Sequence, residues 1–154
     1  MQHILLTITM LLLSMASASA QSNIQSKSKE ELIDYIKENI ETLGNFMGTN
    51  YRVAYDAAEP NHLRIGENTD GDIKWFKIDL SKASFGTSVS ILATGKENFF
   101  LSFRKDITIK EKNNKNAGLD VAFFKRKDKR EADYGDLIES LTMAFTSLIN
   151  KCRS

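Results

Sequence analysis

The chain has 154 residues with 21 basic and 20 acidic side chains, and its formal net charge of +1 gives no overall field toward nucleic acid or an anionic membrane. Residues 29–154 are enough for one globular domain with its own hydrophobic core, and no repeat or low-complexity linker divides them. The single cysteine, Cys152, excludes an internal disulfide. The core must therefore be stable without a covalent crosslink.

The first 20 residues have the pattern of a secretory signal peptide. An apolar run at residues 4–13 is followed by small residues, and residues 18–20 (Ala-Ser-Ala) form an A-x-A cleavage motif ahead of Gln21. No later segment has the roughly 20 apolar residues of a membrane-spanning helix. We therefore expect a soluble, secreted or periplasmic protein that begins at Gln21 and has no transmembrane segment after cleavage.

A polar lead-in, residues 21–28, precedes the first expected helix. Ser28 and Glu31 form an S-x-x-E capping box, which satisfies free amides at a helix start. Apolar residues then recur at helical spacing. They are Leu32, Ile33, Ile36, Ile40, Leu43 and Met47. The spacing predicts a helix from about Lys29 to Phe46 that ends near Gly44 or Gly48.

The middle of the chain changes to short runs rich in β-branched and aromatic residues, separated by turn residues. The runs are residues 51–55, 62–67, 73–80, 88–94, 99–105, 107–112 and 119–125. They predict seven strands in mainly antiparallel, sequential order, with Asp70-Gly71 as a hairpin turn. If residues 103–109 form one bent strand instead, the count is six.

The last segment predicts an amphipathic helix that opens near Asp133. Its apolar stripe consists of Leu137, Leu141, Ala144, Phe145, Leu148 and Cys152, widened by Ile138 and Ile149. The fold class is therefore α+β, with helices that cover sheet surface. Cys152 is expected to be a buried small hydrophobic residue, and an intermolecular disulfide or a reactive thiol is the alternative.

Seven short strands followed by the helix ending "MAFTSLINKC" resemble the pleckstrin-homology-like split barrel, as found in small exported bacterial proteins of unknown function. The resemblance covers residues 51–152 and leaves the first helix as an addition. Phosphoinositide-binding members of that family use basic residues around the first hairpin. The corresponding loop here, residues 56–61, is acidic, so the resemblance does not imply that lipid site.

Catalytic and metal chemistry have few candidates. His62 is the only histidine after residue 20, and nothing in the sequence places a nucleophile beside it, so we expect a surface or turn histidine. One histidine and one cysteine do not favour a zinc site, and we expect no metal or cofactor. Residues 66–77 fail the calcium-loop pattern at its first and twelfth positions. Weak calcium binding by Glu67, Asp70 and Asp72 stays open, as does a glycosidase-like carboxylate pair.

The densest charge run lies between the last strand and the final helix. It consists of Lys125, Arg126, Lys127, Lys129 and Arg130. We expect a solvated connection that protects a sheet edge. The alternative is contact with an anionic surface such as lipid headgroups, acidic glycan or nucleic acid. Aromatic residues do not interleave the run, which does not favour nucleic acid.

Three predicted strands carry an aromatic residue on the face opposite their main apolar face: Trp75, Phe100 and Phe124. We expect the final helix to plug one open end of the barrel and the first helix to lie on an outer face, where it covers Trp75. The alternative is an exposed aromatic patch for a protein partner or an apolar ligand.

The leading functional hypothesis is an exported, soluble, non-enzymatic binding or protein-interaction module. The second is a carrier of a lipid or other apolar small molecule in a barrel cavity. The third is a small hydrolase. A filled core with an exposed aromatic patch would favour the first of these, and a large internal cavity the second.

Overall fold

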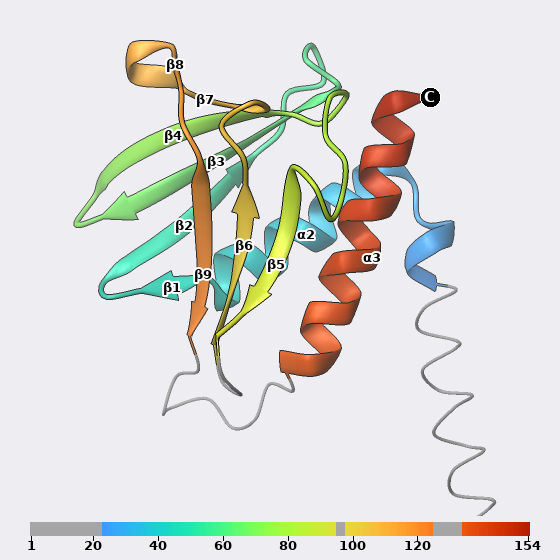
Figure 1. The fold of residues 1–154 in the computed structure, drawn as a ribbon, viewed down its shortest axis with the longest axis horizontal. Helices are drawn as coiled ribbons and strands as arrows, with labels where there is room; N and C mark the ends of the chain where they lie inside the picture. The colour runs from blue at the N-terminus through green and yellow to red at the C-terminus, as the bar shows by residue number, and fades with distance from the viewer. Residues whose placement is uncertain (1–22, 95–97, 125–133) are drawn as a thin grey trace, which may run out of the picture.

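The computed structural model describes residues 23–94, 98–124 and 134–154, so the predicted signal peptide and the basic run at residues 125–130 lie outside the described residues. The fold is α+β: an N-terminal helix, a nine-stranded curled half-barrel sheet that is mostly antiparallel, and a long C-terminal helix (Figure 1).

The sheet has the strand order β5-β6-β9-β1-β2-β3-β4-β7-β8. Its strands are β1 (Asn45–Phe46), β2 (Thr49–Ala54), β3 (His62–Thr69), β4 (Asp72–Asp79), β5 (Val89–Ala93), β6 (Asn98–Phe103), β7 (Thr108–Lys110), β8 (Lys115–Asn116) and β9 (Leu119–Phe124). A 3₁₀ turn at Glu111–Asn113 joins β7 to β8. The two halves of the sheet join where β1 pairs in parallel with β9 at Asn45 and Phe123.

All seven predicted strands form, and among the described residues the two-residue strands β1 and β8 are the ones that the sequence analysis did not predict. Residues 103–109 are not one bent strand, because β6 ends at Phe103 and pairs with β5 and β9, while β7 pairs with β4 and β8. The expected sequential order holds for β2-β3-β4 and for the β5-β6 pair. It is wrong between β4 and β5, between β6 and β7, and between β7 and β9. After β4 the chain crosses to start the other edge at β5, and only the short β7-β8 hairpin extends the β4 side.

The first helix, α2 (Lys29–Leu43), begins at the predicted capping box. The Ser28 hydroxyl accepts from the Glu31 amide at 3.1 Å, and the Glu31 carboxylate accepts from the Ser28 amide at 2.6 Å. The helix ends at Gly44, where a Cβ atom would lie 2.6 Å from the Ile40 carbonyl oxygen. It is shorter than the predicted span to Phe46, because residues 45–50 form the β1-β2 hairpin instead.

The last helix, α3 (Tyr134–Arg153), buries the whole predicted stripe from Leu137 to Cys152. The Cys152 side chain is only 6% exposed, which confirms its place in the core. Burial raises the pKa of the Cys152 thiol, so the nucleophilic thiolate is disfavoured.

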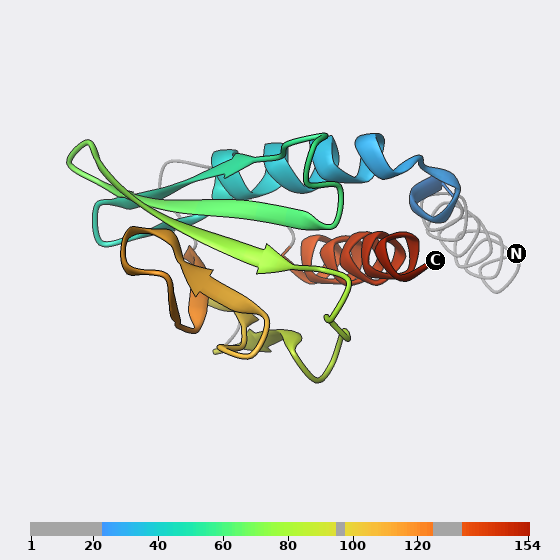
Figure 2. The ribbon, with the colours of Figure 1, turned by 90° about the horizontal axis from the view of Figure 1, so that it is seen from above.

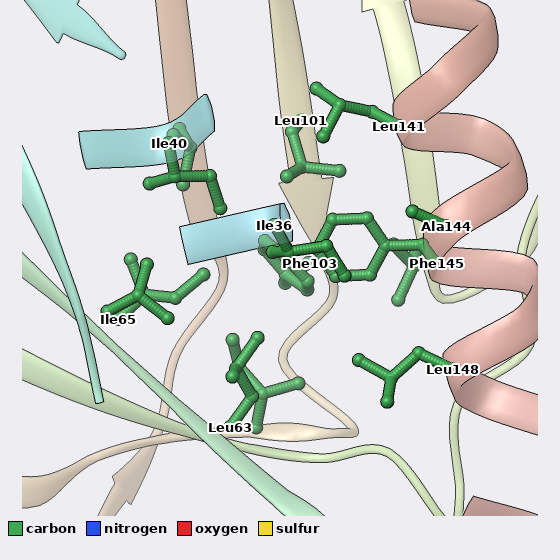
Figure 3. Packing of buried hydrophobic residues seen from close by; sticks show 14 of the residues in the cluster. Ile36, Ile40, Leu63, Ile65, Leu101, Phe103, Leu141, Ala144, Phe145 and Leu148 are labelled. Carbon is green, nitrogen blue, oxygen red and sulfur yellow. The ribbon is translucent and has the colours of Figure 1, made fainter. Parts of the chain in front are cut away.

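Both helices contribute to one core on the concave side of the sheet (Figures 1 and 2). Ile36 of α2 and Phe145 of α3 are fully buried together with Leu63 of β3 and Phe103 of β6 (Figure 3). The rings of Phe103 and Phe145 meet edge to face, with centroids 5.6 Å apart. The expectation that the first helix lies on an outer face is therefore wrong: its apolar stripe completes the inner core.

Candidate interaction surface

Phe100 and Phe124 lie side by side on the outer, convex face of the sheet. Strand alternation turns Phe99 and Phe123 inward, and the antiparallel register of β6 and β9 then brings their outward neighbours together. The Phe100 and Phe124 ring centroids are 5.7 Å apart in an edge-to-face arrangement. The structure therefore brings together two of the three aromatic residues that the sequence singled out.

Phe46 and Leu92 extend this pair into a cluster. The ring of Phe46, from β1, lies 5.2 Å from that of Phe124, and Leu92 of β5 stands directly opposite Phe100. Phe46 is 39% exposed and Leu92 is 55% exposed, while both phenylalanines between them are half-buried. We call Phe46, Leu92, Phe100 and Phe124 the outer aromatic patch.

The sequence missed Phe46 and Leu92 for different reasons. Phe46 fell at the end of the predicted first helix, so the hairpin that turns it outward was not recognised. Leu92 follows Ile91 directly, and two adjacent apolar residues in a strand must face opposite ways. That adjacency was the available signal for an outward leucine.

The turn between β1 and β2 adjoins the patch and carries the most exposed of the large apolar side chains. Met47 is 89% exposed, and it sits with Gly48 in the left-handed region at φ values of 47° and 86°. Two successive residues with positive φ are typical of a tight hairpin turn. The hairpin therefore holds Met47 outward at its tip.

The patch occupies one end of the outer face. Further along the same strands the outward side chains are polar: Ser90 opposes Ser102, and Ser102 opposes Asp120. The Ser102 hydroxyl donates to the Asp120 carboxylate at 2.6 Å. The outer face of β5, β6 and β9 is thus apolar at one end and polar at the other.

Trp75 lies on the outer face too, but on β4, apart from the patch. Its ring rests over Gly66 of β3, where a Cβ atom would lie 3.1 Å from the ring. The Arg64 guanidinium lies 5.0 Å from the ring centroid and is itself held by both oxygens of Glu111 at 2.6 Å. Neighbours within the sheet therefore cover Trp75, and the predicted cover by the first helix does not occur.

His62 lines a hollow of about 330 Å³ beside Asp79 and Lys82. The Ser81 hydroxyl donates to Asp79 at 2.5 Å, so its one proton is not directed at the imidazole and a Ser-His-Asp relay is not assembled. Burial acts to raise the pKa of Asp79, but hydrogen bonds from Ser81 and Lys82 outweigh it and hold that pKa below its ordinary value. The carboxylate is therefore an ionised partner for Lys82, 2.9 Å away.

Tyr51 and Glu67 face each other across β2 and β3, near the junction of the two sheet halves. The Tyr51 hydroxyl accepts from the Ala122 amide at 3.1 Å, so it links β2 to β9. Burial raises the pKa of Tyr51. Burial also raises the pKa of Glu67, although the positive charges of Lys74 and Lys110 act to lower it. A carboxyl group with a raised pKa is the feature here that favours a hydrolase.

Among the residues that the structure describes, no group of three His, Cys, Asp or Glu side chains lies close enough together to hold a metal ion. Asp70 and Gly71 form the predicted hairpin turn, with φ values of 51° and 89°. The five predicted anion-contact residues, Lys125, Arg126, Lys127, Lys129 and Arg130, lie outside the described residues.

No protein-family model matches the sequence, and neither a curated protein nor a solved structure is significantly similar to it. Within the described residues, every helix is too short or too polar to cross a membrane. A functional proposal for this chain therefore depends on the geometry of its own side chains.

Proposed function

We propose that this protein is an exported, non-enzymatic interaction module and that the outer aromatic patch is its contact surface. One observation carries the proposal: four apolar side chains gather on the face of the sheet turned away from α2 and α3, namely Phe46, Leu92, Phe100 and Phe124. Each square ångström of apolar surface removed from water contributes about 25 cal/mol. A cluster of aromatic side chains left outside the core is typical of a binding hot spot.

The filled centre of the half-barrel supports an interaction module over a carrier. Phe99, Phe103, Phe123 and Phe145 are at most 2% exposed and occupy the inner side of the curl. The rings of Phe99 and Phe123 stack with centroids 4.3 Å apart. A carrier of an apolar molecule needs a cavity of several hundred cubic ångströms in such a place.

A small hydrolase is the second candidate, and the raised pKa of Glu67 is the observation in its favour. A hydrolase also needs room for a substrate at that carboxyl group. Neither the hollow beside His62 nor a second one of about 210 Å³, lined by Ser84, Phe85 and residues of α3, includes Glu67. The patch is therefore the better candidate for function.

The proposal includes export through cleavage ahead of Gln21, and intact-mass analysis of the exported protein tests this. We also propose that the curled sheet is a split barrel of the pleckstrin-homology-like type. The link from the Tyr51 hydroxyl to the β9 backbone, where the two sheet halves diverge, is consistent with a split barrel.

Site-specific photo-crosslinking tests the contact surface. A photoreactive amino acid at position 92 should give adducts with a macromolecule in cells that export the protein. The same amino acid at Lys112, an exposed residue in the turn between β7 and β8, is the matched control. Adducts from position 92 and not from position 112 support the proposal. Equal yields, or no adducts from position 92, contradict it.

A further inference from the structure

We propose that the protein forms a two-fold dimer through β5, which joins the sheets of two copies into one continuous sheet. The inference rests on the proposed function, because it names a second copy of this chain as the partner of Leu92, a member of the outer aromatic patch. Three features carry it: the open main-chain edge of β5, the position of Leu92, and the absence of charge along the strand.

Strand β5 is the last strand on one side of the sheet, so alternate residues present unpaired main-chain groups to solvent (Figure 1). The Thr94 amide donates to the Asn98 carbonyl at 2.9 Å, which shows that the even-numbered residues of β5 face β6. The N–H and C=O groups of Ile91 and Ala93 therefore face the open edge, where no described strand pairs with them. The partner that matches such a row of donors and acceptors is another extended main chain.

The open stretch of β5 is short and has a defined beginning. The Val89 amide donates to the Ser84 carbonyl at 3.1 Å, and the Val89 carbonyl accepts from the Gly86 amide at 2.7 Å. The loop before β5 thus closes the edge at Val89, and the open stretch begins at Ile91. A stretch this short leaves little choice of register.

One antiparallel register pairs every open group with a second copy of β5. Ile91 exchanges hydrogen bonds with Ala93 of the second copy, and Ala93 does so with Ile91 of the second copy. The two-fold axis then passes between the two Leu92 residues, which oppose each other as a non-hydrogen-bonded pair. The Cβ atoms of directly opposed residues are about 4.5–5.5 Å apart, and such a pair lies at the close end of that range. An isologous contact of this kind closes the assembly at two copies.

The side chains of β5 suit a copy of the same strand. Leu92 is 55% exposed on the convex face, where it continues the row formed by Phe124 and Phe100. In the dimer the row of the second copy follows directly, so each Leu92 gains an apolar neighbour on its open side. On the concave face, the large Ile91 side chain lies opposite the small Ala93 of the second copy. A strand from another protein needs an apolar residue at that one position, and a copy of β5 supplies it.

The two edges of the sheet differ in their protection against pairing. The opposite edge strand, β8, is two residues long and carries Lys115, and short charged edge strands discourage pairing. Residues 88–94, by contrast, include no charged residue and no proline. Two copies of β5 therefore meet without charge repulsion from the strand itself.

Sedimentation velocity of the full exported chain tests this inference. A dimer should form as the protein concentration is raised over a hundredfold range. Ala93→Pro removes an amide that faces the open edge and leaves the bonds to β6 in place, so it should weaken dimerisation at least tenfold. A monomer at every concentration, or unchanged dimerisation of Ala93→Pro, would overturn the inference.

Asn116→Pro, on the opposite edge, is the matched control. The Ala117 amide donates to the Thr108 carbonyl at 3.1 Å, so the neighbouring Asn116 amide faces outward from β8 as the Ala93 amide does from β5. This variant should dimerise like the natural protein. Equal weakening by Asn116→Pro and Ala93→Pro would overturn the inference. Circular dichroism and melting temperature confirm that each variant is folded.

Oxidative crosslinking locates the two-fold axis. Leu92→Cys places two thiols opposite each other within reach of a disulfide, so mild oxidation should give covalent dimers. In Ser90→Cys, on the same face of the same strand, the two thiols are about 13 Å apart along the strands, too far for a disulfide. Crosslinking of Leu92→Cys should be at least fivefold faster. The natural chain, whose Cys152 is buried, gives the background. Equal rates in the two variants would overturn the inference.

Photo-crosslinking at position 92 separates this inference from the proposed function. Adducts of twice the mass of the chain support both. Adducts with another protein, formed by a chain that sediments as a monomer, reject the dimer and keep the interaction module. The absence of adducts from position 92 rejects both proposals.

Discussion

The Arg64 guanidinium lies 5.0 Å from the centre of the Trp75 ring, on the outer face of the sheet. Glu111 fixes that guanidinium with two hydrogen bonds of 2.6 Å, and this ion pair raises the pKa of Arg64 further. Two residues of β3 thus hold the indole. Arg64 places a cation next to the ring, and Gly66 leaves room for the ring to lie against the sheet because it has no side chain. Trp75 is a half-buried residue of the sheet surface, held by its own neighbours.

Substitution Arg64→Ala should expose Trp75. Because Trp75 is the only tryptophan in the chain, its fluorescence emission should shift to the red in the folded protein. The stability loss should be no more than about 1 kcal/mol, since cation–π contacts and ion pairs at exposed sites are weak. Arg104→Ala, an exposed and ion-paired arginine that follows β6 in the other half of the sheet, is the control. An unchanged emission maximum in Arg64→Ala would show that the guanidinium does not cover the ring.

Local signals in the sequence predicted most of the elements and little of their arrangement. The capping box at Ser28 and the apolar stripe of α3 depend on residues a few positions apart, and both helices were found. Strand order depends on contacts between distant residues, such as the pairing of Phe76 with Lys110 across β4 and β7. Periodicity carries no information about such partners. Hydrophobic periodicity also did not show whether the first helix packs on the concave or the convex side of the curled sheet.

For the candidate surface, too, the sequence predicted individual residues but not which of them lie together. Alternation identified Phe100 and Phe124 as outward residues, but their contact follows from the β6-β9 register, which no local pattern specifies. Trp75 gave the same local signal and proved to be separate from them. The position of the Trp75 ring over Gly66 depends on the register of β3 and β4. The Asp70-Gly71 turn predicted that these two strands form a hairpin, but not which residues face each other.

Substitution Ile36→Ala tests the position of α2 inside the curl. Ile36 is fully buried against both the sheet and α3, so the cavity should lower the free energy of unfolding by about 2–5 kcal/mol. Emission from Trp75 in the folded variant should not change, because the indole lies on the other face. Lys37→Ala, on the exposed side of the same helix, should cost little. A red shift in folded Ile36→Ala would contradict this arrangement.

Substitution Thr108→Val should stabilise the protein. Thr108 is fully buried on β7, and its hydroxyl has no hydrogen-bond partner in the described structure. A buried hydroxyl without a partner costs about 1–3 kcal/mol, and valine fills the same volume without that group. We expect a gain of about 1 kcal/mol, measured as a higher midpoint of urea unfolding with an unchanged slope. Thr49→Val is the comparison, because the Thr49 hydroxyl is 2.8 Å from that of Thr69 and its loss should give no gain.

The raised pKa of Glu67 predicts a specific pH dependence of stability. Burial disfavours the ionised carboxylate, so the folded protein binds the Glu67 proton more tightly than the unfolded chain does. The stability contributed by that proton is complete below the ordinary value of 4.5 and is lost as the pH rises through the raised pKa.

Glu67→Gln cannot ionise at this position, so it should unfold at a higher denaturant concentration than the natural protein at pH 7. The two proteins should become similar in stability below pH 4. Urea unfolding at intervals from pH 3.5 to pH 7.5 measures the difference. Asp72→Asn, in the exposed part of the neighbouring strand, is the matched control and should not reproduce this trend. A difference between Glu67→Gln and the natural protein that is constant across the range would show that Glu67 does not titrate with a raised pKa.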